Sequence, residues 1–248
     1  MATRMQIAKW TLLIAGIAVV ITCDVAGQAP RDKAKPVEKA AGKPAGKPAA
    51  KPSLKPGQID LEKSRVYVYV GKKGFGHAHG VEGNIKSGSI NAKGYAAAEI
   101  SGEIVFDTSS FSADTDEARK QVDLKGSIAE STREQVTETM NGPDVLDVEK
   151  FPTATFKFKS TGGRFGSKGG PSYTLEGDLT LHGHTRPLKI VVEQTREDDG
   201  RMSYRGNFTI LQSDYGIKPY KAALGSVGVA DELKIWGDIW VANEVNQK

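Results

Sequence analysis

Residues 146–156 are LDVEKFPTATF, and residues 175–188 are LEGDLTLHGHTRPL; these two stretches decide how the chain folds. In the second stretch Leu175, Leu179 and Leu181 alternate with polar residues, and the first ends in the alternating pair Ala154 and Phe156. A period of two places apolar side chains on one face of a strand and polar side chains on the other. Both stretches therefore predict strands of an antiparallel sheet with one buried face.

The same alternation recurs along the chain after Gly57. It predicts eight strands, of which the second is the weakest, at residues 65–70, 77–86, 98–106, 154–159, 173–181, 188–193, 204–210 and 233–241. Asp198-Asp199-Gly200 closes one hairpin, and Gly183 with Pro187 brackets another, which favours a meander. The sequence thus predicts a mainly β fold, either a closed eight-stranded barrel or an open two-sheet sandwich.

The period breaks between Ser112 and Lys150, where the sequence becomes charged and polar. Ser131-Thr132-Arg133-Glu134 fits a capping box, and Asn141-Gly142-Pro143 supplies a stop signal. We expect a short helical insertion at 131–141, with residues 114–120 as a second candidate helix. Its expected place is across one end of the sheet, as a plug or a gate.

Residues 1–27 have the pattern of a signal peptide. Arg4 and Lys9 precede Trp10–Thr22, an uncharged run of 13 residues. Such a helix is about 20 Å long, shorter than the roughly 30 Å hydrocarbon core of a bilayer. Cys23, the only cysteine, offers an alternative, a lipoprotein signal that ends before Cys23 and leaves the protein anchored to a membrane. We therefore expect an exported, periplasmic protein.

Residues 28–56 form a Lys/Pro/Ala-rich segment with Lys-Pro pairs at every fourth position from Lys43 to Pro56. Proline fixes the backbone and lysines repel one another, so we expect a disordered linker. Residues 1–29 carry a charge of +1 and residues 30–56 carry +6, so the chain's total of +4 leaves −3 for residues 57–248. The linker serves as a spacer or contacts an anionic membrane surface. The acidic balance of the rest argues against a nucleic-acid partner.

The two opening stretches give LD-x-x-x-FP-x-A-x-F followed by L-x-G-x-L-x-L-x-G-x-T-x-P, a combination that resembles the YceI-like family. The resemblance covers residues 57–243 and leaves 244–248 as a tail. It implies a lipocalin-like barrel and so favours the closed sheet over the sandwich. It also implies binding of polyisoprenoid or another long-chain lipid in the bacterial envelope.

Periodicity and the resemblance together predict which side chains would line an apolar tunnel. They are the inward-facing members of the later strands: Phe156, Phe158, Leu175, Leu179, Leu181, Ile190, Val192, Phe208, Ile210, Leu233, Ile235 and Ile239. Their role is burial, because each CH₂ removed from water contributes about 0.8 kcal/mol. No cofactor is implied.

All four histidines occur in H-x-H pairs, His77 with His79 and His182 with His184. Alternate residues of a strand share a face, so the pairs could together hold Zn or Cu. The competing interpretation gives these side chains hydrogen-bonding roles near a hairpin. A periplasmic metal binder is accordingly an alternative function.

Trp236 and Trp240 lie on the outer face of the predicted last strand. Two exposed indoles would form a contact surface, for a homodimer, a membrane headgroup layer or a protein partner; alternatively the helical insertion covers them. A filled-core stress or adhesion module that uses this surface is the other alternative function. The glycine-rich segment 71–76 lacks the G-K-[ST] ending of a phosphate loop, and we expect no enzyme.

Overall fold

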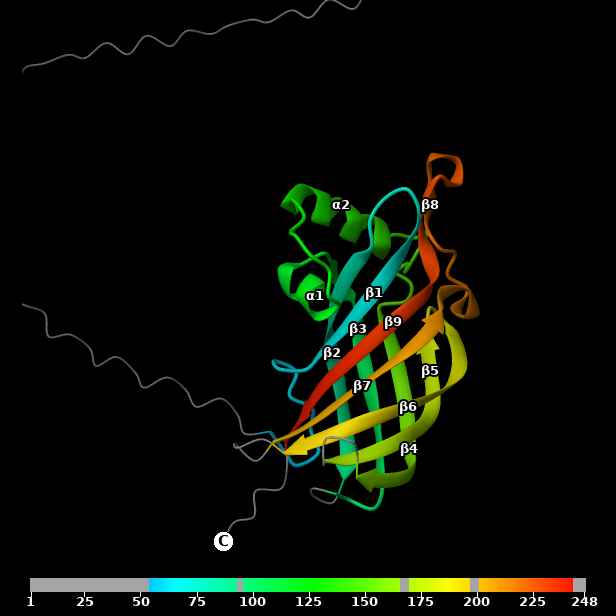
Figure 1. Cartoon of the computed structure of the whole chain (residues 1–248). Coiled ribbons are helices and arrows are strands. Elements are labelled where there is room, and N and C mark those ends of the chain that lie inside the picture. The colour runs from blue at the N-terminus through cyan, green and yellow to red at the C-terminus, as the bar shows by residue number, and fades with distance from the viewer. Residues whose placement is uncertain (1–53, 93–95, 166–169, 197–200, 243–248) are drawn as a thin grey trace, which may run out of the picture. The chain divides into compact units, whose positions relative to one another are not determined.

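The computed structural model describes residues 54–92, 96–165, 170–196 and 201–242 (Figure 1). The predicted signal peptide, most of the predicted linker, the Asp198-Asp199-Gly200 turn and the 244–248 tail lie outside these described residues.

The described chain forms one antiparallel sheet that closes on itself. Its strands are β1 (Arg65–Gly74), β2 (His79–Ala92), β3 (Ile100–Ala113), β4 (Thr153–Phe165), β5 (Pro171–Leu181), β6 (His184–Arg196), β7 (Met202–Leu211), β8 (Lys221–Ala222) and β9 (Val227–Val241). Each strand from β1 to β6 pairs with the strand that follows it, and β9 pairs with both β7 and β1. The predicted closed eight-stranded barrel is therefore confirmed, and the open sandwich is wrong. The two-residue β8 is an additional short ladder on β9.

The side chains that alternate along each strand point alternately into and out of this barrel. Val66 and Val68 of β1, and Phe156 and Phe158 of β4, are all buried and belong to one core cluster. The period-two pattern places them there because successive side chains point to opposite faces of the sheet. The weakest predicted strand is present as β2, which begins at His79 and is 14 residues long.

The polar insertion contains two helices, α1 (Asp116–Gln121) and α2 (Glu130–Asn141). Thr115 caps α1 by accepting a hydrogen bond from the Ala118 amide. The predicted helix at 131–141 is confirmed, but its capping box is wrong: α2 begins at Glu130, after Ala129, and no side chain caps it. No helix among the described residues is both long and apolar enough to span a bilayer.

α2 lies at one end of the barrel (Figure 1). Thr137 accepts a hydrogen bond from the Ala113 amide at 2.9 Å, and Asn141 donates one to the Phe111 carbonyl at 3.1 Å. Both bonds join the helix to β3, yet none of its residues is fully buried. The helix is thus held by partly buried side chains, among them Val136 and Met140, and by these two hydrogen bonds.

The outer face of β9 is covered. Trp236 is half-buried and packs against a cluster of Tyr67, Ala118 and Val122, because α1 returns to the outside of the barrel. Trp240 has Lys63 Nζ 4.8 Å from its ring centroid, with two arginines on the same ring. Of the two alternatives, the structure agrees with coverage of the indoles, and the contact surface for a dimer or a protein partner loses the support it took from them.

Candidate functional site

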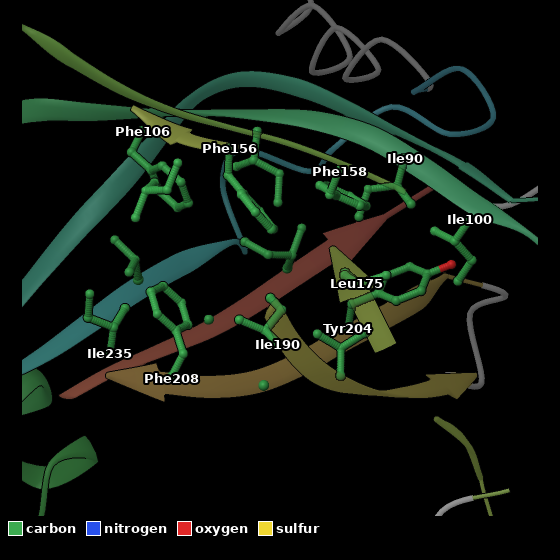
Figure 2. A pocket seen from close by; sticks show the side chains of 17 residues that line it. Ile90, Ile100, Phe106, Phe156, Phe158, Leu175, Ile190, Tyr204, Phe208 and Ile235 are labelled. Atoms are coloured by element: carbon green, nitrogen blue, oxygen red, sulfur yellow. The ribbon is translucent and has the colours of Figure 1, made fainter. Parts of the chain in front are cut away.

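A small apolar cavity lies in the centre of the barrel (Figure 2). Its volume is about 60 Å³. The predicted tunnel residues that line it are Phe156, Phe158, Leu175, Leu179, Ile190, Val192, Phe208, Ile235 and Ile239. The structure adds others that the sequence analysis did not select: Val66, Ile90, Ile100, Ile104, Phe106, Tyr204, Gly206 and Gly237. Period-two alternation in the early strands was the signal for several of these, notably Ile104 and Phe106.

The space in the centre depends on a missing side chain. Gly206 of β7 and Gly237 of β9 are cross-strand partners, and both face the cavity. A Cβ at Gly237 would meet only Ile239 Cγ1, at 4.0 Å, whereas one at Gly206 would lie 2.7 Å from the Val191 carbonyl oxygen. Gly237 is therefore the position where a side chain would fit into the cavity. Gly237 was not among the predicted lining residues, because that prediction selected large apolar side chains.

Aromatic rings occupy much of the remaining interior. Phe156 and Phe158 stack with ring centroids 5.1 Å apart, and Figure 2 shows Phe208 facing the same space. One water occupies about 30 Å³ of liquid, so the central cavity equals about two waters. A long chain could enter this space only if these rings turned aside.

A buried polar network lies at one end of the cavity. The Gln194 side-chain amide donates to the Tyr204 hydroxyl at 2.8 Å and accepts from the Ala96 backbone amide at 3.0 Å. Tyr173 also approaches Gln194, at 3.4 Å. Burial raises the pKa of Tyr204 to about 12, against a smaller opposing effect of its bond to Gln194. This end of the lumen is therefore closed by satisfied, neutral polar groups.

A second and larger cavity lies at the opposite end of the predicted tunnel, beneath α2. Its volume is about 350 Å³, within the usual range for ligand pockets. The other predicted tunnel residues, Leu181, Ile210 and Leu233, line it, and Ile235 lines both cavities. We call the two cavities together the apolar lumen.

The helical insertion contributes directly to this second cavity. Val136 and Met140 of α2 line it with Val145 and Leu146, which follow the helix. Neither Val136 nor Met140 was among the predicted tunnel residues. The insertion is thus part of the wall, as expected for a plug or a gate.

Among the described residues, His182 and His184 do not join His77 and His79 in one group of possible metal ligands, which argues against the alternative of a single site held by all four. His182 and Gly183 form the two-residue turn between β5 and β6, with φ of 50° and 73°. His182 lies against Phe151, with ring centroids 4.4 Å apart, and its Nδ1 is 3.3 Å from the Tyr215 carbonyl oxygen. His184 is not in the turn but is the first residue of β6.

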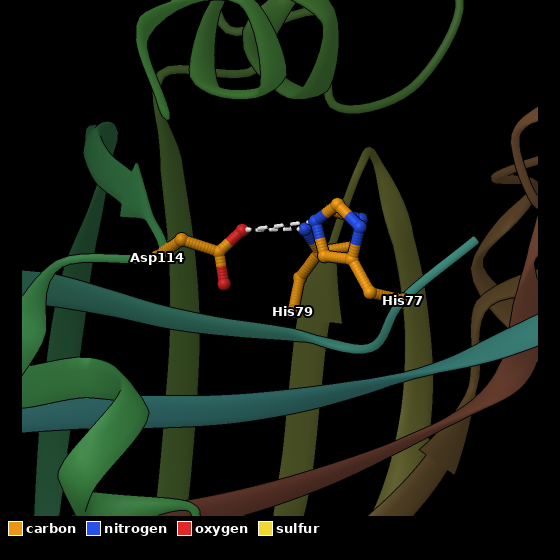
Figure 3. A group of neighbouring side chains, drawn as sticks. All are labelled: His77, His79 and Asp114. Atoms are coloured by element: carbon orange, nitrogen blue, oxygen red, sulfur yellow. Dashed lines mark hydrogen bonds and ion pairs between the residues drawn. The ribbon is translucent and has the colours of Figure 1, made fainter. Parts of the chain in front are cut away.

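The other pair, His77 and His79, lies next to the buried carboxylate of Asp114 (Figure 3). His79 Nδ1 lies 2.6 Å from Asp114 Oδ2, and His77 Nε2 lies 3.9 Å from the same oxygen. Among the described residues, these three form the one group of His, Cys, Asp and Glu side chains with ligand atoms close enough to hold a metal ion. The Asp114 carboxylate is already bonded, however, because Oδ1 accepts from Arg119 at 2.9 Å and from the Gly80 amide at 3.1 Å.

Electrostatics support a structural role for this group. Burial by itself would raise the pKa of Asp114, but hydrogen bonds from His79, Gly80 and Arg119 outweigh it and hold the pKa below its ordinary value. Burial and the neighbouring His79 lower the pKa of His77. The carboxylate thus stays charged and joins β2 to α1 at the edge of the second cavity, which His79 also lines.

Comparisons with known proteins agree with this fold. A family model described as YceI-like domain matches residues 58–240. A UPF0312 protein of Pseudomonas savastanoi pv. phaseolicola is 36% identical over 119 residues, which are 45% of this chain and 59% of that protein. A UPF0312 protein of Pseudomonas aeruginosa is 27% identical over 125 residues, 48% of this chain and 61% of that protein. The matches thus span less than two thirds of these curated relatives.

Two solved structures share the fold at low sequence identity. Burkholderia cenocepacia BcnA is 22% identical with a TM-score of 0.50, over 74% of this chain and 99% of that one. A polyisoprenoid binding domain from Saccharophagus degradans, implicated in plant cell wall breakdown, is 14% identical with a TM-score of 0.50, over 75% of this chain and 97% of that one. With a matching family model over most of its length and the closed barrel that these structures share, this chain belongs to the YceI-like family.

Proposed function

We propose that this protein binds a long-chain apolar lipid, of the polyisoprenoid or fatty-acid type, inside its barrel, as a carrier or store in the bacterial envelope. The observation that carries the proposal is the apolar lumen, in which Ile235 links the cavity beneath α2 to the central cavity. The polyisoprenoid binding domain from Saccharophagus degradans has the same fold and supports the choice of ligand.

The lumen suits hydrocarbon because its wall offers few polar groups. At about 0.8 kcal/mol for each buried CH₂, ten methylene groups would supply about 8 kcal/mol before the cost of ordering the chain. The cavity beneath α2 is large enough to receive the first part of such a chain. Its further path passes Ile235 and requires the rings of Phe156, Phe158 and Phe208 to move.

Export is the second part of the proposal. The charged start and apolar run of residues 1–27 support a signal peptide, and the Lys-Pro pairs of residues 28–56 support an extended linker. The barrel would then work in the periplasm, tethered to a membrane if Cys23 carries a lipid. Mass spectrometry of the N-terminus of the exported protein would distinguish free cleavage from lipidation at Cys23.

The experiment for lipid binding uses the full chain, exported by its own signal. The purified protein is extracted with organic solvent, and the extract is examined by mass spectrometry. We expect an isoprenoid or fatty species at about one molecule per chain. A clean extract, together with no uptake of added polyprenyl lipid, would refute the carrier function.

The small volume of the central cavity favours one competing function, a filled-core envelope module that binds a protein partner. A filled core predicts no extracted lipid and no change in thermal stability when polyprenyl lipid is added. The carrier function predicts a higher Tm with lipid, because a ligand that binds only the folded state stabilises it.

A further inference from the structure

Two apolar side chains project into solvent beside the cavity beneath α2. Phe75, in the connection from β1 to β2, is 78% exposed, and Leu224, between β8 and β9, is fully exposed. Leu224 lies in the short 3₁₀ turn η2 (Ala223–Gly225). The β8 segment extends beyond the end of the barrel, beside the loop that joins β1 to β2 (Figure 1).

The two connections are held together as one unit, which we call the apolar tip. The Phe75 amide donates to the Ser226 carbonyl at 2.9 Å, and Phe75 bridges to Val227 in parallel. Gly74 has a φ of +73° and lies so close to the Ser226 carbonyl that no side chain fits there. Phe75 and Leu224 therefore belong to two loops with a fixed mutual position.

Leu224 is an unusual residue for its place. Its φ of 55° and ψ of 30° are in the left-handed region, where Gly or Asn is favoured over a branched apolar side chain. It also gains nothing from burial, because its side chain is open to water. The left-handed backbone of Leu224 costs stability, and its exposed side chain contributes no burial to offset that cost, which points to a function for the side chain at this site.

Lysines surround the tip. Lys73 and Lys221 both pair with Gly228 of β9, from its two sides, and both are exposed, as is Lys72. Segments 71–78 and 216–230 contain four lysines, including Lys218, and no Asp or Glu. Residues 57–248 as a whole carry −3, so the basic character of these two segments is local. The nearest acid along β9, Asp231, accepts hydrogen bonds from Ser213.

We propose that the apolar tip docks the barrel on a bilayer that carries anionic headgroups. Phe75 and Leu224 enter the interfacial layer while the lysines face the headgroups, the combination by which peripheral proteins bind such surfaces. The mouth of the lumen then faces the membrane, because Tyr220 and Val229, from the same end of the barrel, line the cavity beneath α2. The proposal rests on the proposed function in one respect, that the docked barrel exchanges lipid with the bilayer.

The test is binding of the full exported chain to vesicles of phosphatidylglycerol and phosphatidylcholine, compared with vesicles of phosphatidylcholine alone. The first variant, Phe75→Ser with Leu224→Asn, removes the apolar contacts while Asn suits the left-handed backbone. We expect at least tenfold weaker binding, since each side chain loses the burial of an apolar group. The second variant, Lys72→Gln with Lys73→Gln, should weaken binding to the anionic vesicles about tenfold or more and reduce its salt dependence.

Matched controls lie elsewhere on the barrel. Val191→Ser removes a half-exposed apolar side chain on β6, and Lys157→Gln with Lys159→Gln removes two exposed charges on β4. Each control keeps the Lys/Pro segment, whose own attraction to anionic lipid is then common to all proteins compared. Binding that is equal in the wild type and both tip variants, or a loss as large in the controls, would overturn the proposal.

Solvent extraction of the same proteins distinguishes this proposal from the proposed function. If the extract contains no lipid but the tip variants still lose vesicle binding, docking holds and lipid carriage fails. If lipid is present and vesicle binding is unchanged by the tip variants, carriage holds and docking at this tip fails.

Discussion

Gly237→Val is the substitution that most directly tests whether the lumen receives a lipid. Gly237 faces the central cavity, and the nearest atom to a new Cβ there is Ile239 Cγ1, at 4.0 Å. Its φ is not in the left-handed region, so valine meets no backbone obstacle. Three added carbons would fill a cavity the size of about two waters.

The magnitude follows from burial. In the lipid-free protein, a buried valine in place of a strand glycine should raise the free energy of unfolding by about 2 kcal/mol. For a domain of this size that corresponds to a rise in Tm of roughly 4–8 °C. A bound chain would lose the space of about three methylene groups, at about 0.8 kcal/mol each. Its affinity should therefore fall by about 2 kcal/mol, or roughly 30-fold.

The assay has two readouts on each protein. Calorimetry of lipid-free protein gives Tm, and titration with a fluorescent polyene fatty acid or a polyprenyl lipid gives Kd. Gly162→Val on β4 is the matched control, because a Cβ there meets nothing within 4 Å and points away from the lumen wall. We expect the control to change neither Tm nor Kd by more than a small amount.

Each result is informative. A higher Tm with weaker lipid binding supports a ligand that extends past Ile235 into the centre of the barrel. A higher Tm with unchanged Kd would refute that reasoning and confine the ligand to the cavity beneath α2. A lower Tm would show that the backbone at Gly237 tolerates no side chain, contrary to the space around it.

Three further predictions concern the ends of the lumen. Tyr204→Phe should lower the free energy of unfolding in urea by about 1–3 kcal/mol, because Gln194 loses a buried partner. The pKa of Tyr204 is raised in the folded state, so the wild type should also lose about 2–3 kcal/mol of stability as the pH rises from 10 to 12. The variant should not show this loss. Asp114→Asn should lower the free energy of unfolding by about 3–5 kcal/mol, because buried Arg119 loses its anion. The pKa of Asp114 is lowered in the folded state, so the stability that the carboxylate contributes is present above about pH 3.8 and is lost as the pH falls further. Stability measured from pH 2 to 5 should therefore depend less on pH in the variant. Met140→Ser should speed the release of a fluorescent lipid severalfold in stopped-flow measurements, with little change in Tm, because α2 has no fully buried residue.

Alternation in the sequence predicts the strands and their inward and outward faces, because these depend on neighbouring residues in the chain. Leu175, Leu179 and Leu181 face inward because every second residue of a strand must share a face. Closure of the barrel does not follow from local sequence, because β1 pairs with β9 through residues that are far apart in the chain, such as Val68 and Ile235. Periodicity alone was equally compatible with a sandwich, and the family resemblance made the choice.

The sequence left alternatives open where a distant segment covers or separates the candidate residues. Exposure and coverage of Trp236 both stayed open, since nothing in its own strand shows that α1 returns to the same face. His182 and His184 share an H-x-H spacing, but the left-handed turn at His182 takes this residue out of the strand. The space at Gly237 could not be predicted from the sequence either, because it depends on residues that seven other strands bring to the same cavity.

The two ends of the lumen differ in what it takes to open them, and this difference determines how a ligand enters. At the closed end, opening breaks the bonds of Gln194 to Tyr204 and to the Ala96 amide, at about 1–3 kcal/mol for each buried group left unpaired. At the other end, α2 has no side-chain cap and no fully buried residue, and the side chains of Thr137 and Asn141 hydrogen-bond it to β3. That end also has the apolar cavity of about 350 Å³, whose lining includes Tyr220 near the apolar tip. The balance favours entry beneath α2, next to the exposed Phe75 and Leu224, and a disulfide that held α2 to β3 should therefore slow lipid uptake while leaving the barrel folded.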